Sequence, residues 1–296
     1  MNSKINMSTM LERDQCDLCG NSQFTKLYNL DWRIVVKCKE CGLVFVQQHD
    51  INPKFDNIMN DNDYRKYFES NFLDFRLKSY YKALEHLIVL LNGIQGKRVL
   101  DLGSSFGFFL TLAKNSGMIV EGIEGSNYEA QIAEREKLIP TTIANLNELQ
   151  LKSEVYDLVT LWDVLEHLNS PQTVLKKVYC SLKKEGILLV RVPSRDGLIP
   201  ILSHLIYRFS FGRISFPIKK LFEFHQYHFN TKTIKSFLIK NNFTVVDIYY
   251  EHYINPDVVN KKDYGSNLLL SGILQVVIRM ARILNLQDEI VIYARK

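Results

Sequence analysis

Residues 99–110, with the sequence VLDLGSSFGFFL, decide the fold of this chain. They predict a short apolar strand, a turn of small residues and the start of a helix. Such a turn places backbone N–H groups at the carboxyl edge of a sheet, where open α/β folds bind ligands. The next predicted strand ends at Glu124, which lies 21 residues beyond Gly103. This is near the distance at which an acidic side chain accepts hydrogen bonds from a ribose, so the two features together predict a nucleoside-binding unit.

The same alternation continues on the carboxyl side of this stretch. Apolar strands are predicted at 98–102, 118–123, 143–144, 156–162 and 187–192, and amphipathic helices between them at 107–116, 127–138 and 171–184. Two further strands, 243–250 and 289–294, flank a helix-like segment at 266–285. Strands that alternate with helices in this way predict an α/β fold with a doubly wound, mainly parallel sheet.

Two segments resemble the class I S-adenosylmethionine-dependent methyltransferases, which have a Rossmann-like fold. Their first motif has the form D-x-G-x-G-x-G, which Asp101, Gly103 and Gly107 match, while Ser105 replaces the middle glycine. Residues 156–167, YDLVTLWDVLEH, closely match the family segment that ends in Glu-His. The G-x-G-x-x-G fingerprint of the competing nicotinamide dehydrogenases is absent from the turn. The resemblance is close over 97–192, moderate over 288–295 and loose over 196–286.

The resemblance implies a binding site for S-adenosylmethionine. It places Asp101 and Gly103 near the aminoacyl end of the cofactor, Glu124 at the ribose hydroxyls, and Asn145 where the family often has an aspartate that contacts the adenine. The cofactor-binding residues that follow are Asp101, Gly103, Ser105, Gly107, Glu124, Asn145 and Asp163.

A separate motif lies near the N-terminus. Cysteines at positions 16, 19, 38 and 41 form the pattern C-x2-C-x18-C-x2-C, which lies within the spacing range of zinc ribbons. Gly20 and Gly42 each follow a pair and suit the tight turn that brings two thiolates to one ion. The segments 24–28 and 33–37 between the pairs are predicted strands. Four thiolates leave no open coordination position, so the expected zinc is structural, with Cys16, Cys19, Cys38 and Cys41 as its ligands. The alternative is that these are free thiols whose spacing matches the pattern by chance.

A ribbon ahead of such a domain is similar to the branch of methyltransferases that carry an N-terminal cysteine-rich, zinc-binding domain. That branch acts on nucleotide sugars, surface polysaccharides and natural products. We expect a zinc-ribbon-like segment at 1–46, a linker and helical cap at 47–92, and the methyltransferase domain at 93–296 with an acceptor lid at about 196–230.

Methyl transfer to an alcohol is accelerated by a general base, and histidine suits that role at neutral pH. The candidates are His167, which follows the fourth strand of the domain, and His225, which resembles the histidine of an H-x-x-x-F segment that lines the acceptor pocket. In the related sugar C-methyltransferases a Tyr-x-Glu-His run carries the base. Residues 222–225 correspond to this run, and of its residues only the histidine, His225, is retained. This favours O-methylation over C-methylation of a keto-sugar. His228 is an alternative base, and all these histidines also suit a packing or capping role.

Composition limits the partners. Against 37 basic residues the chain has 32 acidic ones, which gives a net charge of +5, and the ribbon is nearly balanced, so a nucleic-acid partner is not expected. No signal peptide or membrane span is predicted, so we expect a cytoplasmic protein. The apolar segments 198–222 and 266–285 are interpreted as lids, homodimer contacts or contacts with the inner face of the membrane. The leading hypothesis is a methyltransferase for a small molecule or saccharide, and the alternatives are an RNA or protein methyltransferase and a non-catalytic binding module.

Overall fold

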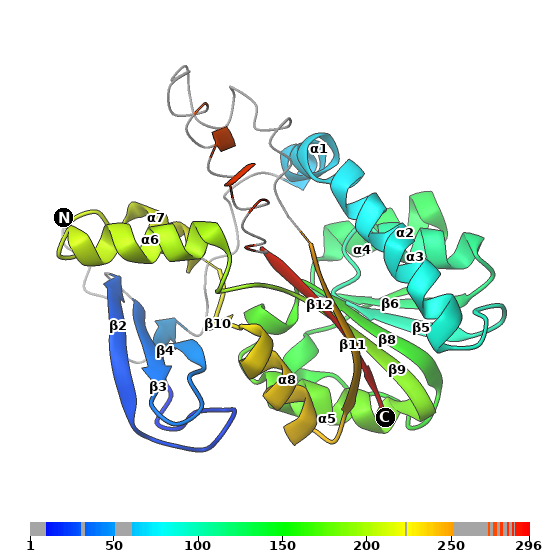
Figure 1. Cartoon of the computed structure of the whole chain (residues 1–296). Helices are drawn as coiled ribbons and strands as arrows, with labels where there is room; N and C mark the ends of the chain where they lie inside the picture. Colours follow the sequence, from blue (N-terminus) through cyan, green and yellow to red (C-terminus); the bar gives the residue numbers. More distant parts are fainter. Residues whose placement is uncertain are drawn as a thin grey trace.

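A computed structural model describes residues 10–30, 33–50, 61–222, 224–251 and 288–296, together with isolated positions between 272 and 286. These described residues form two sheets with helices packed against them (Figure 1). Most of the predicted helix over 266–285 lies outside the described residues. Within the described part of the chain, no helix is both long enough and apolar enough to cross a membrane.

The larger sheet has seven strands in the order β11-β12-β9-β8-β5-β6-β7. Its strands are β5 (Arg98–Leu102), β6 (Ile119–Glu124), β7 (Thr141–Ile143), β8 (Tyr156–Trp162), β9 (Leu182–Pro193), β11 (Thr244–Glu251) and β12 (Glu289–Arg295). The five strands from β7 to β9 run parallel, whereas β12 is antiparallel to both of its neighbours. The predicted doubly wound, mainly parallel fold is therefore confirmed.

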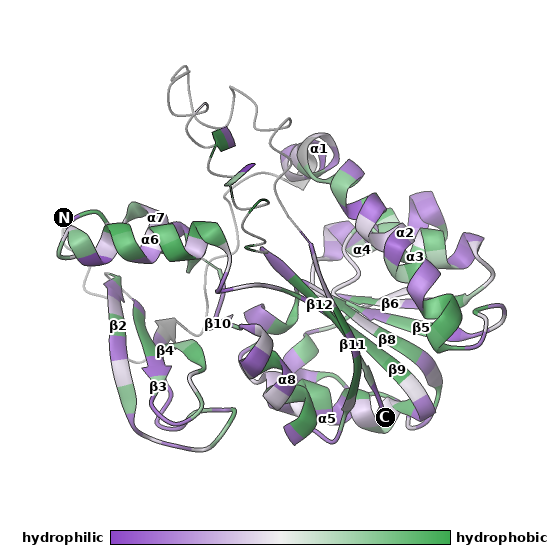
Figure 2. Cartoon of the chain, in the orientation of Figure 1, coloured by the Kyte–Doolittle hydropathy of each residue, from purple (hydrophilic) through white to green (hydrophobic). Residues whose placement is uncertain are grey.

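Helices cover both faces of this sheet because alternate residues of its strands point to opposite sides. Val99 and Leu158 pack with helices on one face, whereas Leu100 and Val159 belong to the core of the other. The first face carries α2 (Leu73–Leu90), α3 (Phe108–Asn115) and α4 (Asn127–Lys137), and the second carries α5 (Pro171–Ser181) and α8 (Thr231–Lys240). The colouring in Figure 2 shows the apolar strands of this sheet between the helices.

Among the strands of the larger sheet, β9 differs most from its predicted bounds. The helix expected to reach residue 184 ends at Ser181, and β9 begins at Leu182, well before the expected start at 187. Lysines and a glutamate at 183–185 favour a helix, but Glu185 takes a positive φ of 64° and the register between β8 and β9 shifts there. Leu182 and Ile187 pair with Tyr156 and Leu158 of β8, and residues 183–186 form the irregularity between these two pairs.

The second sheet is antiparallel and is built mainly from the N-terminal segment. Its strands are β1 (Met10–Glu12), β2 (Phe24–Leu30), β3 (Arg33–Cys38), β4 (Val44–Asp50) and the short β10 (Tyr227–His228). β10 comes from the segment expected to form an acceptor lid, and it pairs with β4. The two sheets share one continuous core, in which Cys16, Leu18 and Phe45 pack with residues of the larger sheet.

The rest of the expected lid also lies against the N-terminal sheet. It forms α6 (Leu198–Phe209) and α7 (Phe216–Leu221), which lie side by side above β2 and β4 (Figure 1). Ile218 and Phe222 pack against Tyr28 and other buried residues of this sheet.

Part of the segment expected to be a linker and helical cap, 47–92, forms regular structure. β4 continues to Asp50, and the helices α1 (Asp61–Asn71) and α2 follow. Residues 51–60 lie outside the described part of the chain.

Candidate active site and metal centre

The glycine loop follows β5 at the carboxyl edge of the larger sheet. Gly103, Ser105 and Gly107 all take positive φ values, of 73°, 48° and 73°, so the chain turns sharply before α3 begins. The backbone N–H of Gly103 donates to the carbonyl of Ile123 at 2.7 Å, which ties the loop to β6. A Cβ on Gly103 would lie 2.5 Å from Val164 Cγ2, so only glycine fits between the loop and the turn after β8.

Glu124 extends from the end of β6 to this loop. Its Oε2 accepts a hydrogen bond from the backbone N–H of Ser105 at 2.8 Å, and its Oε1 accepts one from Ser126 N–H at 2.8 Å. Each carboxylate oxygen has a second lone pair available for a ligand hydroxyl. Ser105 Oγ donates to Glu129 at 2.5 Å, so the serine that replaces the family's middle glycine joins loop and helix.

This edge is the topological switch point of the sheet. From β5 the chain adds β6 and β7 on one side and then returns to add β8 and β9 on the other. Ligands of open α/β sheets bind in the crevice at such a point. The glycine loop and Glu124 thus fit a nucleoside-containing cofactor, because the loop makes a tight turn at the sheet edge and the carboxylate can accept hydrogen bonds from ribose hydroxyls.

Asp101 lies inside the sheet rather than at its surface. Thr160 Oγ1 donates to it at 2.6 Å, and burial raises its pKa to about 8, against the lowering effect of that hydrogen bond. The side chain therefore supports the glycine loop from within.

Asp163 lies in a buried cluster of charges that the sequence analysis missed. It follows β8 with a φ of 54°, accepts a hydrogen bond from Arg191 Nη1 at 2.5 Å, and also pairs with Arg76. Arg191 is fully buried in β9 and lies within 4 Å of carboxylate oxygens of Glu251 and Glu289. An arginine within the apolar run of residues 187–193 was the available signal, because a buried cation needs partners.

Asn145 follows β7, at the position predicted for the adenine contact. Its Oδ1 accepts from the backbone N–H of Asn147 at 3.0 Å, which caps the short turn Leu146–Glu148. Asn145 also lines a cavity of about 460 Å³ with Ile123 and Tyr156. Gly103 and Glu124 do not line this cavity.

The helix α1 lies over the glycine loop. Phe68 stacks on Phe108 with ring centroids 5.8 Å apart and contacts Phe106 at 6.0 Å. Arg65 anchors the helix to α4 through paired hydrogen bonds of 2.7 and 2.6 Å to Glu136.

Two histidines that are distant in sequence meet beyond the end of β8. The ring centroids of His167 and His225 lie 4.7 Å apart, and His228 lies 5.5 Å from His225. The backbone N–H of Gln226 donates to the carbonyl of Glu166 at 2.7 Å, and β10 pairs with β4, so the N-terminal sheet helps to hold His225 beside His167.

The electrostatic environment keeps these imidazoles neutral. Burial lowers the pKa of His167 from its ordinary value near 6.5, and burial with the neighbouring His167, His228 and Arg33 lowers the pKa of His225 well below it. Nδ1 of His167 lies 3.2 Å from the carbonyl of Phe224, which can only accept, so Nδ1 carries the proton and Nε2 presents its lone pair.

A buried carboxyl group stands beside this pair. Glu166 is 1% exposed, its Oε1 lies 3.9 Å from His167 Nε2, and burial and the nearby Asp163 raise its pKa well above the usual range. The potential ligand atoms of Glu166, His167 and His225 all lie within 4.8 Å of one another, so this group could hold either a proton or a cation.

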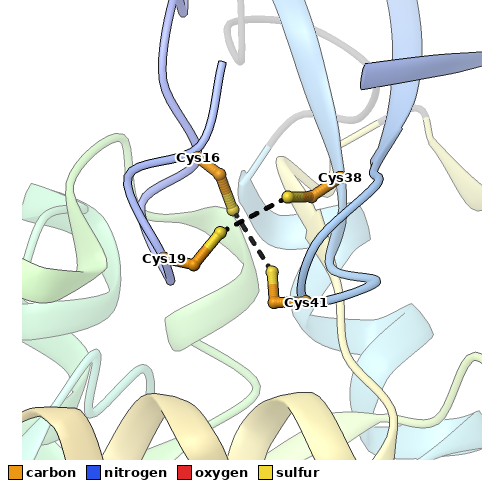
Figure 3. Close-up of side chains that lie close together, drawn as sticks. All are labelled: Cys16, Cys19, Cys38 and Cys41. Atoms are coloured by element: carbon orange, nitrogen blue, oxygen red, sulfur yellow. Dashed lines mark hydrogen bonds between the residues drawn. The ribbon is translucent and has the colours of Figure 1, made fainter. Parts of the chain in front are cut away.

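The four N-terminal cysteines converge, as Figure 3 shows. Sγ of Cys16 lies 3.5 Å from Sγ of Cys41, and Sγ of Cys19 lies 3.4 Å from Sγ of Cys38. A tetrahedral zinc ion with Zn–S bonds of about 2.3 Å requires S–S separations of roughly 3.8 Å, so the cluster fits this ion closely.

The two cysteine knuckles have the same geometry. Gly20 N–H donates to Cys16 O and Gly42 N–H to Cys38 O, and both glycines take a φ of 79°. Such a symmetric arrangement of turns brings the two pairs of thiols to one point. The chemistry and spacing of the donors match the structural zinc predicted from sequence.

The larger sheet, with its glycine loop and the acid at the end of β6, defines a class I methyltransferase fold. A family model described as a methyltransferase domain matches residues 75–248, more than half of the chain. The chain therefore belongs to this methyltransferase family, whose class uses S-adenosylmethionine as the methyl donor.

Curated relatives match a central part of the chain. The ubiquinone biosynthesis O-methyltransferase of Haemophilus ducreyi is 30% identical over 114 residues, which cover 35% of this chain and 48% of that protein. The chain thus spans about half the length of the curated relatives it matches.

Solved structures share the fold at low sequence identity. A methyltransferase from Thermotoga maritima has a TM-score of 0.50 at 20% identity and covers 79% of this chain and 95% of its own. The geranyl diphosphate C-methyltransferase of Streptomyces coelicolor has a TM-score of 0.51 at 12% identity and covers 73% and 80%, respectively. At these identities the comparison supports the fold alone.

Proposed function

We propose that this protein transfers a methyl group from S-adenosylmethionine to a hydroxyl oxygen of a small-molecule acceptor, with His167 and His225 as the proton-accepting pair. The proposal is supported mainly by the contact between two neutral imidazoles beside the buried Glu166. Val164, in the same turn as Glu166 and His167, packs against Gly103 of the glycine loop. Bound S-adenosylmethionine would supply an electrophilic methyl group on its sulfonium.

The cofactor residues in this proposal are those at the switch point. Glu124 would accept the ribose hydroxyls, the backbone of Gly103, Ser105 and Gly107 would contact the aminoacyl portion, and Asn145 would contact the adenine. Asp101 and Asp163 hold these loops in place from beneath, through Thr160 and the buried arginines. The proposed roles follow from the positions of these residues at the carboxyl edge of the sheet.

The histidine pair would act when the acceptor oxygen attacks. An acceptor oxygen would take the methyl group from the sulfonium of S-adenosylmethionine as the S–CH3 bond breaks, and the hydroxyl proton would pass to a ring nitrogen, for which we propose His167 Nε2. The carboxyl group of Glu166, 3.9 Å from this nitrogen, would stabilise the protonated ring or share its proton. Direct displacement needs alignment and exclusion of water, and no covalent intermediate on the protein.

Membership in the methyltransferase family does not specify the acceptor, and we propose a narrower class of acceptor molecules. The curated relative from Haemophilus ducreyi is named as an O-methyltransferase, which supports oxygen as the methylated atom. The cysteine cluster ahead of the domain resembles that of the branch that modifies nucleotide sugars and surface polysaccharides, so we propose a saccharide or a related hydroxylated metabolite. We propose a cytoplasmic site of action.

A methyl-transfer screen with mass detection tests the proposal. Purified protein is incubated with S-adenosylmethionine and with phenols, nucleotide sugars or glycan extracts, and the product is located by fragmentation. We expect an O-methylated product, and about a 100-fold or larger fall in kcat for His225→Gln or His167→Gln.

The matched control is His86→Gln, since His86 lies on α2 and contacts Asp247 at the surface. Cofactor affinity should stay unchanged in all three variants. Full activity of both active-site variants, or methylation at nitrogen or carbon, would contradict the proposed chemistry.

A further inference from the structure

The turn between α6 and α7 carries an unusual concentration of exposed apolar side chains. Phe209, Phe211, Ile214 and Phe216 are 77%, 91%, 55% and 69% exposed, respectively. We call these four residues the apolar tip. In Figure 1 the turn lies at the end of α6 and α7 farthest from the seven-stranded sheet. Single exposed apolar residues are common on protein surfaces, but a cluster with three phenylalanines marks an interaction site.

The turn presents these side chains in a fixed conformation. Gly212 N–H donates to the carbonyl of Tyr207 at 2.8 Å, and Ile214 N–H donates to Ser210 Oγ at 3.0 Å. These backbone groups of the turn therefore have hydrogen-bond partners, so the tip is exposed as part of an ordered turn.

The opposite face of α6 is anchored to the N-terminal sheet. Tyr28 donates or accepts a 2.8 Å hydrogen bond with His204 Nδ1, and its ring meets that of Tyr207 edge-on at 5.1 Å. The outward face nevertheless exposes Ile201 and Leu205, in continuity with Phe209. Figure 2 shows the apolar residues along this helix. A helix with apolar residues on both its packed and its outward face needs a second apolar partner.

The charges around the tip identify the kind of partner. Residues 197–222 contain four basic residues, Arg208, Arg213, Lys219 and Lys220, and no acidic residue. Aromatic side chains next to basic residues are typical of segments that lie in the headgroup region of an anionic lipid layer. Each lysine or arginine close to such a surface strengthens binding about fivefold.

The same charges disfavour two other occupants. A second copy of the tip would bring its own cations against these four. The apolar run at 266–285 in this chain contains Arg279 and Arg282 and no acidic residue, so it offers no charge complementarity either.

We infer that the apolar tip and its flanking basic residues dock this protein on the surface of an anionic lipid bilayer. Phe209, Phe211 and Phe216 would enter the headgroup region, while Arg208 and Arg213 would contact lipid phosphates. The inference rests on exposure and charge at α6 and α7, and it is independent of the identity of the methyl acceptor.

Vesicle co-sedimentation of the full chain tests the inference. The probes are vesicles of phosphatidylcholine alone and vesicles in which about 30% of the lipid is the anionic phosphatidylglycerol. We expect at least tenfold stronger binding to the anionic vesicles, and weaker binding as salt is raised.

Two sets of variants assign the binding to the tip. Phe209→Ser combined with Phe211→Ser should weaken it at least tenfold, and Arg208→Gln combined with Arg213→Gln about 25-fold, by the fivefold effect per cation. The control Tyr81→Ser removes an aromatic side chain on α2 that is 56% exposed, and it should bind as the parent does.

Emission from a Phe211→Trp variant gives a second readout that does not depend on loss of a side chain. Anionic vesicles should shift its emission to shorter wavelengths relative to the parent protein. Three results would overturn the inference: no vesicle binding by the parent, equal binding by the serine double variant, or a tip whose substitution only converts a dimer to a monomer.

Discussion

His228 illustrates at the scale of one residue how burial shapes the chemistry of this site. Its ring is fully packed, stacks on Phe222 at 3.8 Å, and lies 3.2 Å from the carbonyl of Leu221 through Nε2. Burial lowers its pKa to about 3, so it is neutral in the folded state at every pH near neutrality. It is therefore suited to orient the neighbouring His225 through packing and to remain uncharged beside it.

This predicts a measurable dependence of stability on pH. The unfolded chain protonates this histidine below pH 6.5 and the folded chain does not, so its contribution to stability is lost as pH falls from 6.5 toward 3. Between pH 7 and pH 5 the loss amounts to about 2 kcal/mol. Urea unfolding of the parent protein and of His228→Gln at pH 7 and pH 5 measures this loss. The free energy of unfolding should fall more between the two pH values in the parent than in the variant, and the difference is the contribution of His228.

The carboxyl groups with raised pKa values act in the opposite direction but are common to both proteins. Asp101 and Glu166 favour folding at low pH and lose that contribution as pH rises. The comparison between variant and parent cancels them. If His228→Gln lost as much stability as the parent over this range, the histidine would not be held neutral by the fold.

The glycine loop and the acid at the end of β6 were predictable as local structure, because a strand, a small-residue turn and a downstream acid have a local sequence signature. The structure brings loop and acid together, since Ser105 N–H donates to the Glu124 carboxylate. Their roles toward the cofactor stay a prediction. The buried partners of Asp163 were not predictable, since Arg76 and Arg191 are distant in sequence and meet it only through the folded sheet.

At the scale of elements, the cysteine cluster and β10 form a connected unit. Cys38 ends β3, β4 follows the second knuckle, and β4 pairs with the two residues of β10. Because His225 lies just before β10, the cysteine cluster is connected through one strand to the candidate base.

Metal content and removal test this coupling. We expect about one zinc ion per chain, and chelation should lower both the thermal midpoint and kcat. Cys38→Ser should lose zinc and activity together. Cys180→Ser is the matched control, because Cys180 is exposed on α5, far in sequence from the cluster. A metal-free protein with an unchanged thermal midpoint would rule out a structural zinc.

The alternation of strands and helices from 97 onward was predictable from hydrophobic periodicity. The pairing of β10 with β4 was not predictable, because a strand of two residues is too short to show a hydrophobic periodicity. The packing of α6 and α7 on the N-terminal sheet was also hidden, since their apolar spacing does not identify the surface they contact.

On the scale of the whole molecule, two sheets share one core and together place the candidate residues. The glycine loop follows β5 of the seven-stranded sheet, and the N-terminal sheet pairs with β10, the strand that follows His225. The net charge of +5 is modest, but the turn between α6 and α7 concentrates basic residues beside exposed aromatic ones. Local charge, more than net charge, therefore supports the proposed docking surface.

The central claim is that the crevice at the switch point binds S-adenosylmethionine through Glu124. Calorimetric titration of the full chain with S-adenosylmethionine and with its demethylated product tests it most directly. We predict saturable binding to one site, weakened about 10- to 100-fold in Glu124→Gln because hydrogen bonds to a charged group contribute about 1.5–3 kcal/mol. Glu134→Gln, a substitution of an exposed glutamate on α4, should bind as the parent does. The absence of binding, or equal affinity of Glu124→Gln and the parent, would contradict the account.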